Sequence, residues 1–362
     1  MPTKPPEPEP PFAQRVLDWY AFARRDLPWR RTRDPYAVWL SETMLQQTRV
    51  DTVVPYYYRF LSEFPTVSAL AEAPEGKVLA LWSGLGYYRR ARLLHSAAKQ
   101  VEHAHGGQFP RTAGALRALD GVGAYTAGAV ASIAFRERAA VVDGNVARVL
   151  ARLYAIDDDL KSGRGKALVW RLAAKLIAGQ SGDPGDWNQA LMELGATVCV
   201  PRAPRCPTCP ASNHCLAKAR GLTGDLPRTI PKRAPVLMNR VAVVLSSARF
   251  VLLAKRRPDV LFGGLWEPPS GNDLGGLASA LAVDVGDLEP VGQVVHLLTH
   301  RRMHVSVMRG PLRHRRGRGI PGPEYDAVEA VSFDRLDERA QASLTRKVLK
   351  VANLGPRGLR SE

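Results

Sequence analysis

The sequence predicts two domains, an all-α domain followed by a smaller α+β domain, and three observations support this organisation. Between residues 12 and 220, apolar residues recur at three and four positions with breaks at Pro or Gly, which indicates about ten short helices. Residues 221–238 are rich in Pro, Lys and Arg, as in an extended linker. Residues 239–352 contain short apolar runs separated by polar turns, which indicate strands.

The two ends of the chain differ from these domains in composition. The first eleven residues hold six prolines with alternating Glu and no apolar core, which predicts a disordered tail at residues 1–11. Residues 353–362 form a second short tail. Nothing resembles a signal peptide or a run of about eighteen apolar residues, so we expect a cytoplasmic, nucleoid-associated protein without a membrane contact.

The predicted elements follow from the spacing of apolar residues. The clearest helices cover residues 35–47, 49–64, 89–103, 124–135, 144–154 and 165–179. In residues 240–257, two apolar runs joined by a polar turn predict a β-hairpin. Residues 291–298 and 304–310 add two further strands.

The charge of the chain indicates a polyanionic partner. Its 362 residues carry a formal net charge of +17, and Lys and Arg are spread along the whole length. Such a charge favours salt-sensitive binding to nucleic acid. A basic soluble protein without such a partner remains possible on charge alone.

A glycine turn and a carboxylate about twenty residues later give the first chemical signal. Gly121, Val122 and Gly123 lie between two helix-like segments, and glycines let backbone amides approach an anion closely. Asp143 follows two valines at the start of another helical run, where it could also serve as the N-cap. A turn that binds phosphate, with a carboxylate at a fixed offset, fits an enzyme that acts on a sugar carbon in DNA.

The four cysteines of the chain lie within seventeen residues. Cys199, Cys206, Cys209 and Cys215 are separated by six, two and five residues. In a cytosolic chain this clustering predicts a metal site rather than disulfides. Zinc in a four-cysteine site is one possibility, although zinc sites usually contain two CxxC pairs and only one is present here.

The glycine turn, Asp143 and the cysteine spacing together resemble the helix-hairpin-helix DNA glycosylases, the superfamily of endonuclease III. The cysteine spacing resembles the [4Fe–4S] loop of these enzymes, so the resemblance implies a structural cluster held by all four cysteines in residues 199–215. Arg202, Arg205 and Lys218 lie on or beside this loop, and we expect them to present cations to the DNA backbone.

Three further segments resemble one branch of that superfamily, the adenine DNA glycosylases (the MutY family). They read SETMLQQTRV at residues 41–50, GLGYYRRARLLH at 84–95 and VDGNVARVLARLY at 142–154. With the cysteine loop, the resemblance covers residues 12–220 almost end to end. It implies a monomeric enzyme that acts on double-stranded DNA and removes adenine opposite 8-oxoguanine or guanine.

The resemblance also assigns the catalytic residues. Glu42 alone would read as a solvated or ion-paired helical residue, but by family analogy it is the general acid that protonates adenine. Asp143 then stabilises the sugar cation or captures it covalently, and Asn145 hydrogen-bonds near this centre. Tyr125 occupies the position where strand-cleaving members carry a Lys. A phenol cannot form an imine, so we expect a monofunctional enzyme in which Tyr125 supports the Asp143 centre.

Several residues are expected by the same analogy to contact DNA. Gln47 and Tyr87 enter the base stack near the opposing base, and Thr48 hydrogen-bonds there. Trp29, Arg30 and Leu45 line the adenine pocket. Core packing is the alternative for the two aromatic residues.

The second domain, residues 239–352, resembles the start of a Nudix fold at residues 262–269, which read FGGLWEPP. A Nudix hydrolase needs a glutamate-rich helix to hold Mg²⁺, and residues 271–288 contain no Glu, so we do not expect diphosphate hydrolysis. The family instead uses this domain to recognise 8-oxoguanine. Its Phe-Ser-His loop corresponds here to Leu298, Thr299 and His300, which lacks the aromatic ring.

Two other patterns in this domain carry less weight. His296, His300 and His304 are spaced to share one face, but without a neighbouring Cys or carboxylate we do not expect a metal site. Residues 314–318 read HRRGR and predict a solvated loop, with phosphate contact as the second interpretation.

Three rival functions follow from the same residues. A pyrimidine-specific glycosylase-lyase is disfavoured by Tyr125 and the second domain, and a nucleotide-pool hydrolase by the missing glutamates. A DNA-binding protein with an iron–sulfur cluster and no activity is disfavoured by the presence of both Glu42 and Asp143.

Overall fold

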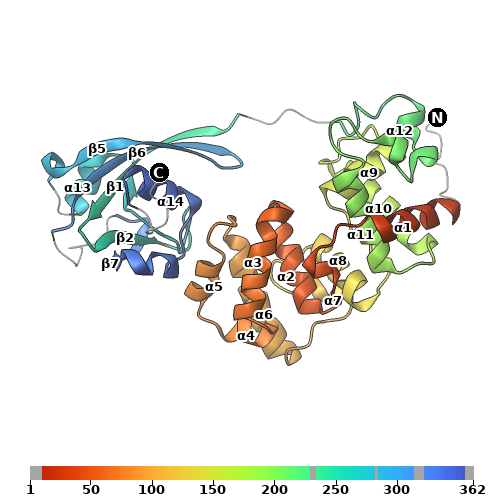
Figure 1. Cartoon of the computed structure of the whole chain (residues 1–362), viewed down its shortest axis with the longest axis horizontal. Coiled ribbons are helices and arrows are strands. Elements are labelled where there is room, and N and C mark those ends of the chain that lie inside the picture. The colour runs from red at the N-terminus through yellow and green to blue at the C-terminus, as the bar shows by residue number, and fades with distance from the viewer. Residues whose placement is uncertain (1–9, 229–233, 282–283, 314–321, 355–362) are drawn as a thin grey trace. The chain divides into compact units, whose positions relative to one another are not determined.

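The computed structural model describes residues 10–228, 234–281, 284–313 and 322–354 (Figure 1). They form two compact units. The first contains residues up to Ala71 and from Ser96 to Pro231, and the second contains Glu72–His95 and the residues from Lys232 onward. None of the described helices is long and apolar enough to cross a membrane.

The residues before the linker are helical throughout. Their helices are α1 (Pro10–Ala23), α2 (Pro35–Leu45), α3 (Val50–Glu63), α4 (Val67–Glu72), α5 (Glu75–Leu81), α6 (Arg89–His105), α7 (Ala113–Leu116), α8 (Ala124–Phe135), α9 (Gly144–Leu153), α10 (Gly163–Gly179), α11 (Pro184–Thr197) and α12 (Leu216–Ala219), with short 3₁₀ turns η1 (Pro28–Arg30), η2 (Cys206–Thr208) and η3 (Ser212–His214). All six predicted helices are confirmed, with ends that differ by at most two residues.

Two predicted boundaries are wrong by a few residues. Helix α1 begins at Pro10, so the tail predicted at residues 1–11 is too long; proline is tolerated in a first helical turn because its missing N–H has no partner there. Strand β1 begins at Val236 because it pairs with β6 from that residue on, so the linker predicted at 221–238 ends earlier. Residues 1–9, 314–318 and 355–362 lie outside the described part of the chain.

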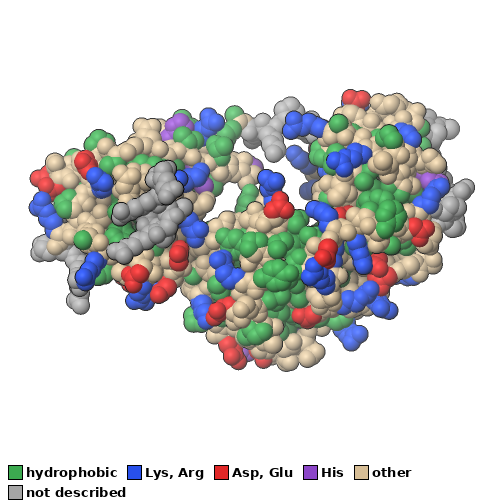
Figure 2. All heavy atoms as spheres, viewed as in Figure 1, with side chains coloured by type: hydrophobic (Ala, Val, Ile, Leu, Met, Phe, Trp, Pro, Cys, Tyr) green, Lys and Arg blue, Asp and Glu red, His purple; other side chains and the backbone are tan. Residues whose placement is uncertain are grey.

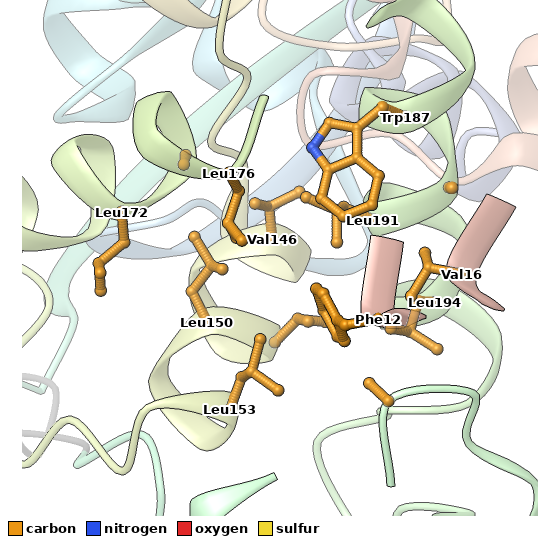
Figure 3. Close-up of a cluster of buried hydrophobic side chains, with 14 of the residues drawn as sticks. Phe12, Val16, Val146, Leu150, Leu153, Leu172, Leu176, Trp187, Leu191 and Leu194 are labelled. Carbon is orange, nitrogen blue, oxygen red and sulfur yellow. The ribbon is translucent and has the colours of Figure 1, made fainter. Parts of the chain in front are cut away.

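A buried cluster fixes the helix that follows Asp143. Val146 and Leu150 of α9 pack among apolar side chains of α1, α10 and α11 (Figure 3). Trp187 of α11 is fully buried and meets the Phe12 ring edge to face, with centroids 6.1 Å apart. Because four helices share this cluster, α9 has little freedom to move, and neither does the residue at its start.

A second packing contact joins α2 to α8. Every residue of α2 from Tyr36 to Met44 is buried, as are the α8 residues from Thr126 to Ile133. Helix α8 follows the turn after α7, where Gly121 has a φ of +72°, a conformation that favours glycine. The segment before Asp143 also lies against α8, since a Cβ on Gly128 would stand 2.3 Å from the Ala140 carbonyl oxygen.

The second unit contains a mixed sheet. Its strands are β1 (Val236–Ser246), β2 (Phe250–Arg256), β3 (Trp266–Glu267), β4 (Ser270–Gly271), β5 (Glu289–Leu297), β6 (Arg301–Pro311) and β7 (Tyr325–Ser332), and its other elements are α13 (Leu274–Ala280), η4 (Val285–Asp287), η5 (Phe333–Glu338) and α14 (Ser343–Val351). The order is β3-β2-β1-β6-β5, with β4 on β1 and β7 on β2. Only β1 and β6 pair in parallel among these described strands. The predicted hairpin (β1–β2) and both further strands (β5 and β6) are confirmed.

Residues Glu72–His95 group with this second unit by their packing, which the prediction of one domain over residues 12–220 did not anticipate. The Gln341 backbone N–H donates to the Ser83 hydroxyl at 2.9 Å, and the Tyr88 hydroxyl donates to the Gln341 carbonyl oxygen. These hydrogen bonds join residues more than 250 positions apart. Local sequence patterns carry no signal for such a contact.

Gly128→Ala tests the close contact between α8 and the segment before Asp143. The added methyl group would collide with a backbone carbonyl, so we expect a loss of about 1–3 kcal/mol in the free energy of unfolding. Gly179→Ala is the matched control, because a Cβ at that helical position meets no atom within 4 Å. Thermal and denaturant unfolding of both variants gives the measurement, and equal stability would contradict the contact.

Candidate active site

Helix α2 places Glu42 inside the first unit. The helix begins with Asp34 as N-cap, whose carboxylate accepts the backbone N–H groups of Tyr36 at 3.3 Å and Ala37 at 3.2 Å. Pro35 occupies the first helical position. Glu42 lies two turns later and is only 5% exposed, so its carboxyl group is almost fully removed from water.

Tyr125 supplies the hydrogen bond that Glu42 receives. Its hydroxyl donates to Glu42 Oε2 at 2.5 Å and lies 3.4 Å from the Met192 sulfur. We expected the phenol to support the Asp143 centre; its hydrogen bond is to Glu42, and Asp143 lies within electrostatic range of the phenol. Tyr125 reaches it because α8 packs against α2.

Asp143 caps α9 and keeps both oxygens engaged. One oxygen accepts the Val146 backbone N–H at 2.7 Å, and the other accepts the Asn145 side-chain amide at 2.9 Å. Burial raises the pKa of Asp143, while these hydrogen bonds and the charge of Arg148 act in the opposite direction. The cap and the hydrogen bond from Asn145 therefore hold the carboxylate in one orientation.

Glu42 and Asp143 are close enough to influence each other electrostatically. Burial, with a smaller contribution from the negative charge of Asp143, raises the pKa of Glu42 to about 7. The Tyr125 hydrogen bond and the Arg30 charge partly oppose this rise. A carboxyl group with this pKa can hold a proton at neutral pH and release it to a bound molecule.

Arg148 is a site residue that the sequence reasoning missed. Its guanidinium donates to the Asn145 side-chain oxygen at 2.9 Å, to the Gly195 carbonyl at 2.8 Å and to the Cys199 carbonyl at 2.8 Å. A Cβ on Gly195 would lie 2.6 Å from the Cβ of Asn145, so α11 passes unusually close to the first turn of α9. The position of Arg148 one turn after Asn145 was the available sequence signal.

A buried ion-pair cluster surrounds the expected pocket residue Arg30. The fully buried carboxylate of Glu193 pairs with Arg30 at 2.7 Å and with Arg25 at 2.8 Å. Burial alone would raise the pKa of Glu193, but hydrogen bonds from both arginines lower it to about 2. The sequence reasoning missed Glu193, although it is the only acidic residue in the apolar stretch NQALMELGA.

The remaining expected pocket residues differ in exposure. Trp29 is buried and packs edge to face against Tyr57, with centroids 5.5 Å apart, which matches the core-packing alternative for this residue. Leu45 is the last residue of α2 and is partly buried.

Gln47 and Tyr87, the expected intercalating residues, have strained backbones. Their φ angles are +60° and +49°, and Tyr87 is 49% exposed. Such values are uncommon outside glycine and are found preferentially at functional positions. Thr48 is partly buried, and its backbone N–H donates to the Leu45 carbonyl at 3.2 Å.

The glycine turn before α8 has an open side. Gly121 and Gly123 are exposed, while Val122 between them is buried and anchors the turn. A Cβ on Gly123 would meet no atom within 4 Å. The Val122 backbone N–H donates to the Leu119 carbonyl at 3.1 Å, and binding of an anion by this turn stays a prediction.

The four cysteines are free thiols that line one cavity. Arg152 is 2% exposed and donates to the Val200 carbonyl at 2.7 Å, with a longer contact of 3.5 Å to the Cys199 sulfur. Burial, together with the neighbouring thiols, raises the pKa of Cys209 to about 11. Thiols gathered in this way fit a group that binds them as thiolates.

The loop that carries these cysteines also exposes positive charge. Arg202, Arg205 and Lys218 are exposed on or beside it. Figure 2 shows that Lys and Arg side chains are spread over the visible face of each unit.

The residues expected to recognise 8-oxoguanine lie in the second unit, at the turn between β5 and β6. Thr299 and His300 are exposed there, and Leu298 is partly buried. The hydroxyl groups of Thr299 and Tyr87 are 3.1 Å apart. The prediction that three histidines share one face is wrong: His296 pairs with Met303 and His304 with Val295, which places the two histidines on opposite faces of the sheet.

The stretch FGGLWEPP has a structural role in this unit. Glu267 is buried and pairs with Arg256 at 2.8 Å, and the Tyr325 hydroxyl donates to the same carboxylate at 2.7 Å. Helix α13 (Leu274–Ala280) and the turn η4 (Val285–Asp287) follow, and the sequence from residue 271 to 288 contains no Glu. The carboxylate of Glu267 is therefore already bound by Arg256 and Tyr325.

Comparison with known proteins matches both parts of the chain. Residues 40–175 match the family described as HhH-GPD superfamily base excision DNA repair protein, and residues 240–351 match the NUDIX domain. The solved structure of a thermostable thymine-DNA glycosylase is 33% identical, with a TM-score of 0.52, over 58% of this chain and 95% of that one.

Curated relatives share one description. The adenine DNA glycosylase of Rattus norvegicus is 50% identical over 59% of this chain and 43% of that protein. The adenine DNA glycosylase of Arabidopsis thaliana is 36% identical over 92% of this chain and 63% of that protein. The chain thus spans less than two thirds of the length of these relatives. From these matches we conclude that the chain belongs to the helix-hairpin-helix superfamily of base excision DNA repair proteins, with a NUDIX domain after the helical part, and that it is similar over most of its length to an adenine DNA glycosylase.

Proposed function

We propose that this protein is a monofunctional DNA glycosylase that removes adenine opposite 8-oxoguanine or guanine in duplex DNA. The observation that carries the proposal is the pair of carboxyl groups in the first unit. Glu42 is buried with a pKa of about 7, and Asp143 is held by a helix cap within its electrostatic reach. The relatives described as adenine DNA glycosylases support the choice of base.

The two carboxyl groups have separate tasks in this proposal. Adenine is a poor leaving group as an anion, so the Glu42 proton passes to adenine N7 as the C1′–N9 bond breaks. Asp143 stabilises the oxocarbenium-like cation that remains on the sugar, or captures it as a covalent intermediate. Water then adds to C1′ and loses a proton, which leaves an abasic site and free adenine.

Tyr125 limits the enzyme to base removal. Strand cleavage by related enzymes uses an amine that forms an imine with the sugar, and a phenol cannot do so. Here the phenol binds Glu42 and opposes the rise in its pKa. We assign Tyr125 the role of setting how readily Glu42 gives up its proton.

The adenine leaves the base stack to reach this site. Arg30, held by the buried Glu193, lies within electrostatic range of Glu42, which places positive charge near the base. The open turn at Gly121–Gly123 binds the DNA backbone through its amides, and Gln47 and Tyr87 fill the gap in the duplex. The strained backbones of these last two residues support this assignment.

We propose that Cys199, Cys206, Cys209 and Cys215 hold a [4Fe–4S] cluster. All four thiols line one cavity. A four-cysteine zinc site usually contains two CxxC pairs and only one is present here, so the spacing of the cysteines favours the cluster. When bound, it would tie the loop together and hold the exposed Arg202 toward DNA.

The second unit reads the base opposite the adenine. Thr299 and His300 offer hydrogen-bonding groups on an exposed turn, and Tyr87 lies in contact with Thr299. Leu298 replaces the aromatic residue of relatives, so this turn lacks a ring for stacking.

Glu42→Gln tests the assignment of the general acid. The amide cannot supply a proton, so we expect duplex binding to persist while single-turnover adenine release falls by about 10²–10⁴-fold. Glu72→Gln makes the same change at an exposed position and should leave release unchanged. Excision by Glu42→Gln at the wild-type rate would refute the assignment, and a borohydride-trapped DNA adduct with the wild type would refute monofunctionality.

The pH dependence of excision tests the role of Tyr125. Because Glu42 must be protonated, the single-turnover rate should fall as the pH rises through about 7. The Tyr125 hydrogen bond lowers the pKa of Glu42, so Tyr125→Phe should move this fall to higher pH. Tyr154→Phe, at the far end of α9, is the control. A fall that moves to lower pH, or does not move, would contradict this role.

Cys209→Ser tests the cluster. Loss of one thiolate ligand should remove the brown absorption and most of the iron and lower the melting temperature. Ser212→Ala alters the same cavity without removing a thiol and should retain all three properties. Metal analysis of the wild type should give about four iron atoms per chain, whereas one zinc atom and no visible absorption would rule out the cluster.

A further inference from the structure

Two segments of the second unit meet at the turn between β5 and β6. The loop at residues 84–88 is held by the hydrogen bonds of Ser83 and Tyr88 to Gln341. From this loop Tyr87 reaches the Thr299 hydroxyl at 3.1 Å. The turn itself is closed by the Leu298 backbone N–H, which donates to the Arg301 carbonyl at 2.8 Å.

The start of β1 is a third segment beside the turn between β5 and β6, and we call these three segments together the tip of the sheet. The Val236 backbone N–H donates to the His300 carbonyl at 2.9 Å. Leu237 of β1 and Leu297 of β5 both pair with Arg302 of β6, so the three side chains share one face of the sheet. Arg301 pairs with Val236 and points to the opposite face. The two arginines therefore lie on both sides of the tip.

The positive charge at this tip is not balanced by nearby carboxylates. Residues 84–92, 236–240 and 291–305 contain no Asp or Glu. Arg89, Arg301 and Arg302 are exposed, and none of them has a carboxylate partner among the residues that the structure describes. Several other exposed arginines of this unit are paired with carboxylates, as in Arg257–Asp259, Arg313–Asp287 and Arg335–Glu338.

We propose that Arg89, Arg301 and Arg302 form a phosphate-binding rim. This rim binds the backbone of duplex DNA beside the base that Tyr87 and Thr299 contact. This inference rests on the proposed function and adds a contact surface to it. Unpaired arginines on either side of an exposed turn suit the phosphates that flank a base. Charge contacts here also supply affinity that the turn, with Leu298 in place of an aromatic residue, does not obtain from stacking.

The salt dependence of DNA binding tests the rim. The probe is a duplex with adenine opposite 8-oxoguanine, bound by full-length protein in the Glu42→Gln background so that the substrate persists. Each lost phosphate contact reduces the slope of log affinity against log salt by about 0.9. We therefore expect Arg301→Gln/Arg302→Gln to reduce the slope by about 2, and Arg89→Gln by about 1.

Two further variants make the result specific. Arg335→Gln removes an exposed arginine that is already paired with Glu338, and its slope should equal the parent's. Arg301→Lys/Arg302→Lys keeps the charge and should restore the parent slope if the double Gln variant acts through charge rather than misfolding. An unchanged slope in the Gln variants would overturn the rim and favour an acidic protein partner instead. Adenine release by the wild type, measured separately, decides the proposed function whatever the slopes show.

Discussion

The burial of Glu42, at the place where α2 packs against α8, is the physical constraint on which the proposed chemistry depends. Helix α2 has almost no exposed side chain, so the carboxyl group loses its hydration and its pKa rises to about 7. One phenol hydrogen bond, from Tyr125, opposes that rise. On a helix with one solvated face the same residue would be ionised at neutral pH and could not donate a proton.

The second carboxylate is fixed by a different device, the start of a helix. One carboxylate oxygen of Asp143 accepts a hydrogen bond from the Val146 backbone N–H in the first turn of α9. Helix α9 is itself held by the buried cluster around Val146 and Trp187. The absence of a side chain at Gly195 lets α11 approach this turn, and Arg148 links it to the Cys199 carbonyl. The stability of the first unit and the orientation of its reactive group thus depend on the same contacts.

Two carboxylates of the second unit, Glu267 and Glu324, form ion pairs with Arg240 and Arg256 of its own strands. Glu267 is held in a buried ion pair with Arg256, and the residues that follow it form α13 without any Glu. Thr299 and His300 are exposed at the turn between β5 and β6. In the proposed function this turn recognises a base, and α13 lacks the glutamates that would hold a metal ion on a diphosphate.

Local sequence patterns were enough to predict six helices before the linker, four strands of the second unit (β1, β2, β5 and β6) and the set of four cysteines. These depend on local spacing, on Pro and Gly at element ends, and on short motifs that contain Glu42 and Asp143. Only the tertiary structure decided that Tyr125 binds Glu42, that Glu193 holds Arg30, and that residues 72–95 pack with the second unit. Each of these joins residues far apart in the chain, 83 positions in the case of Tyr125 and Glu42. Such pairs follow from how helices and strands pack against one another, and the periodicity of a single element does not contain that information.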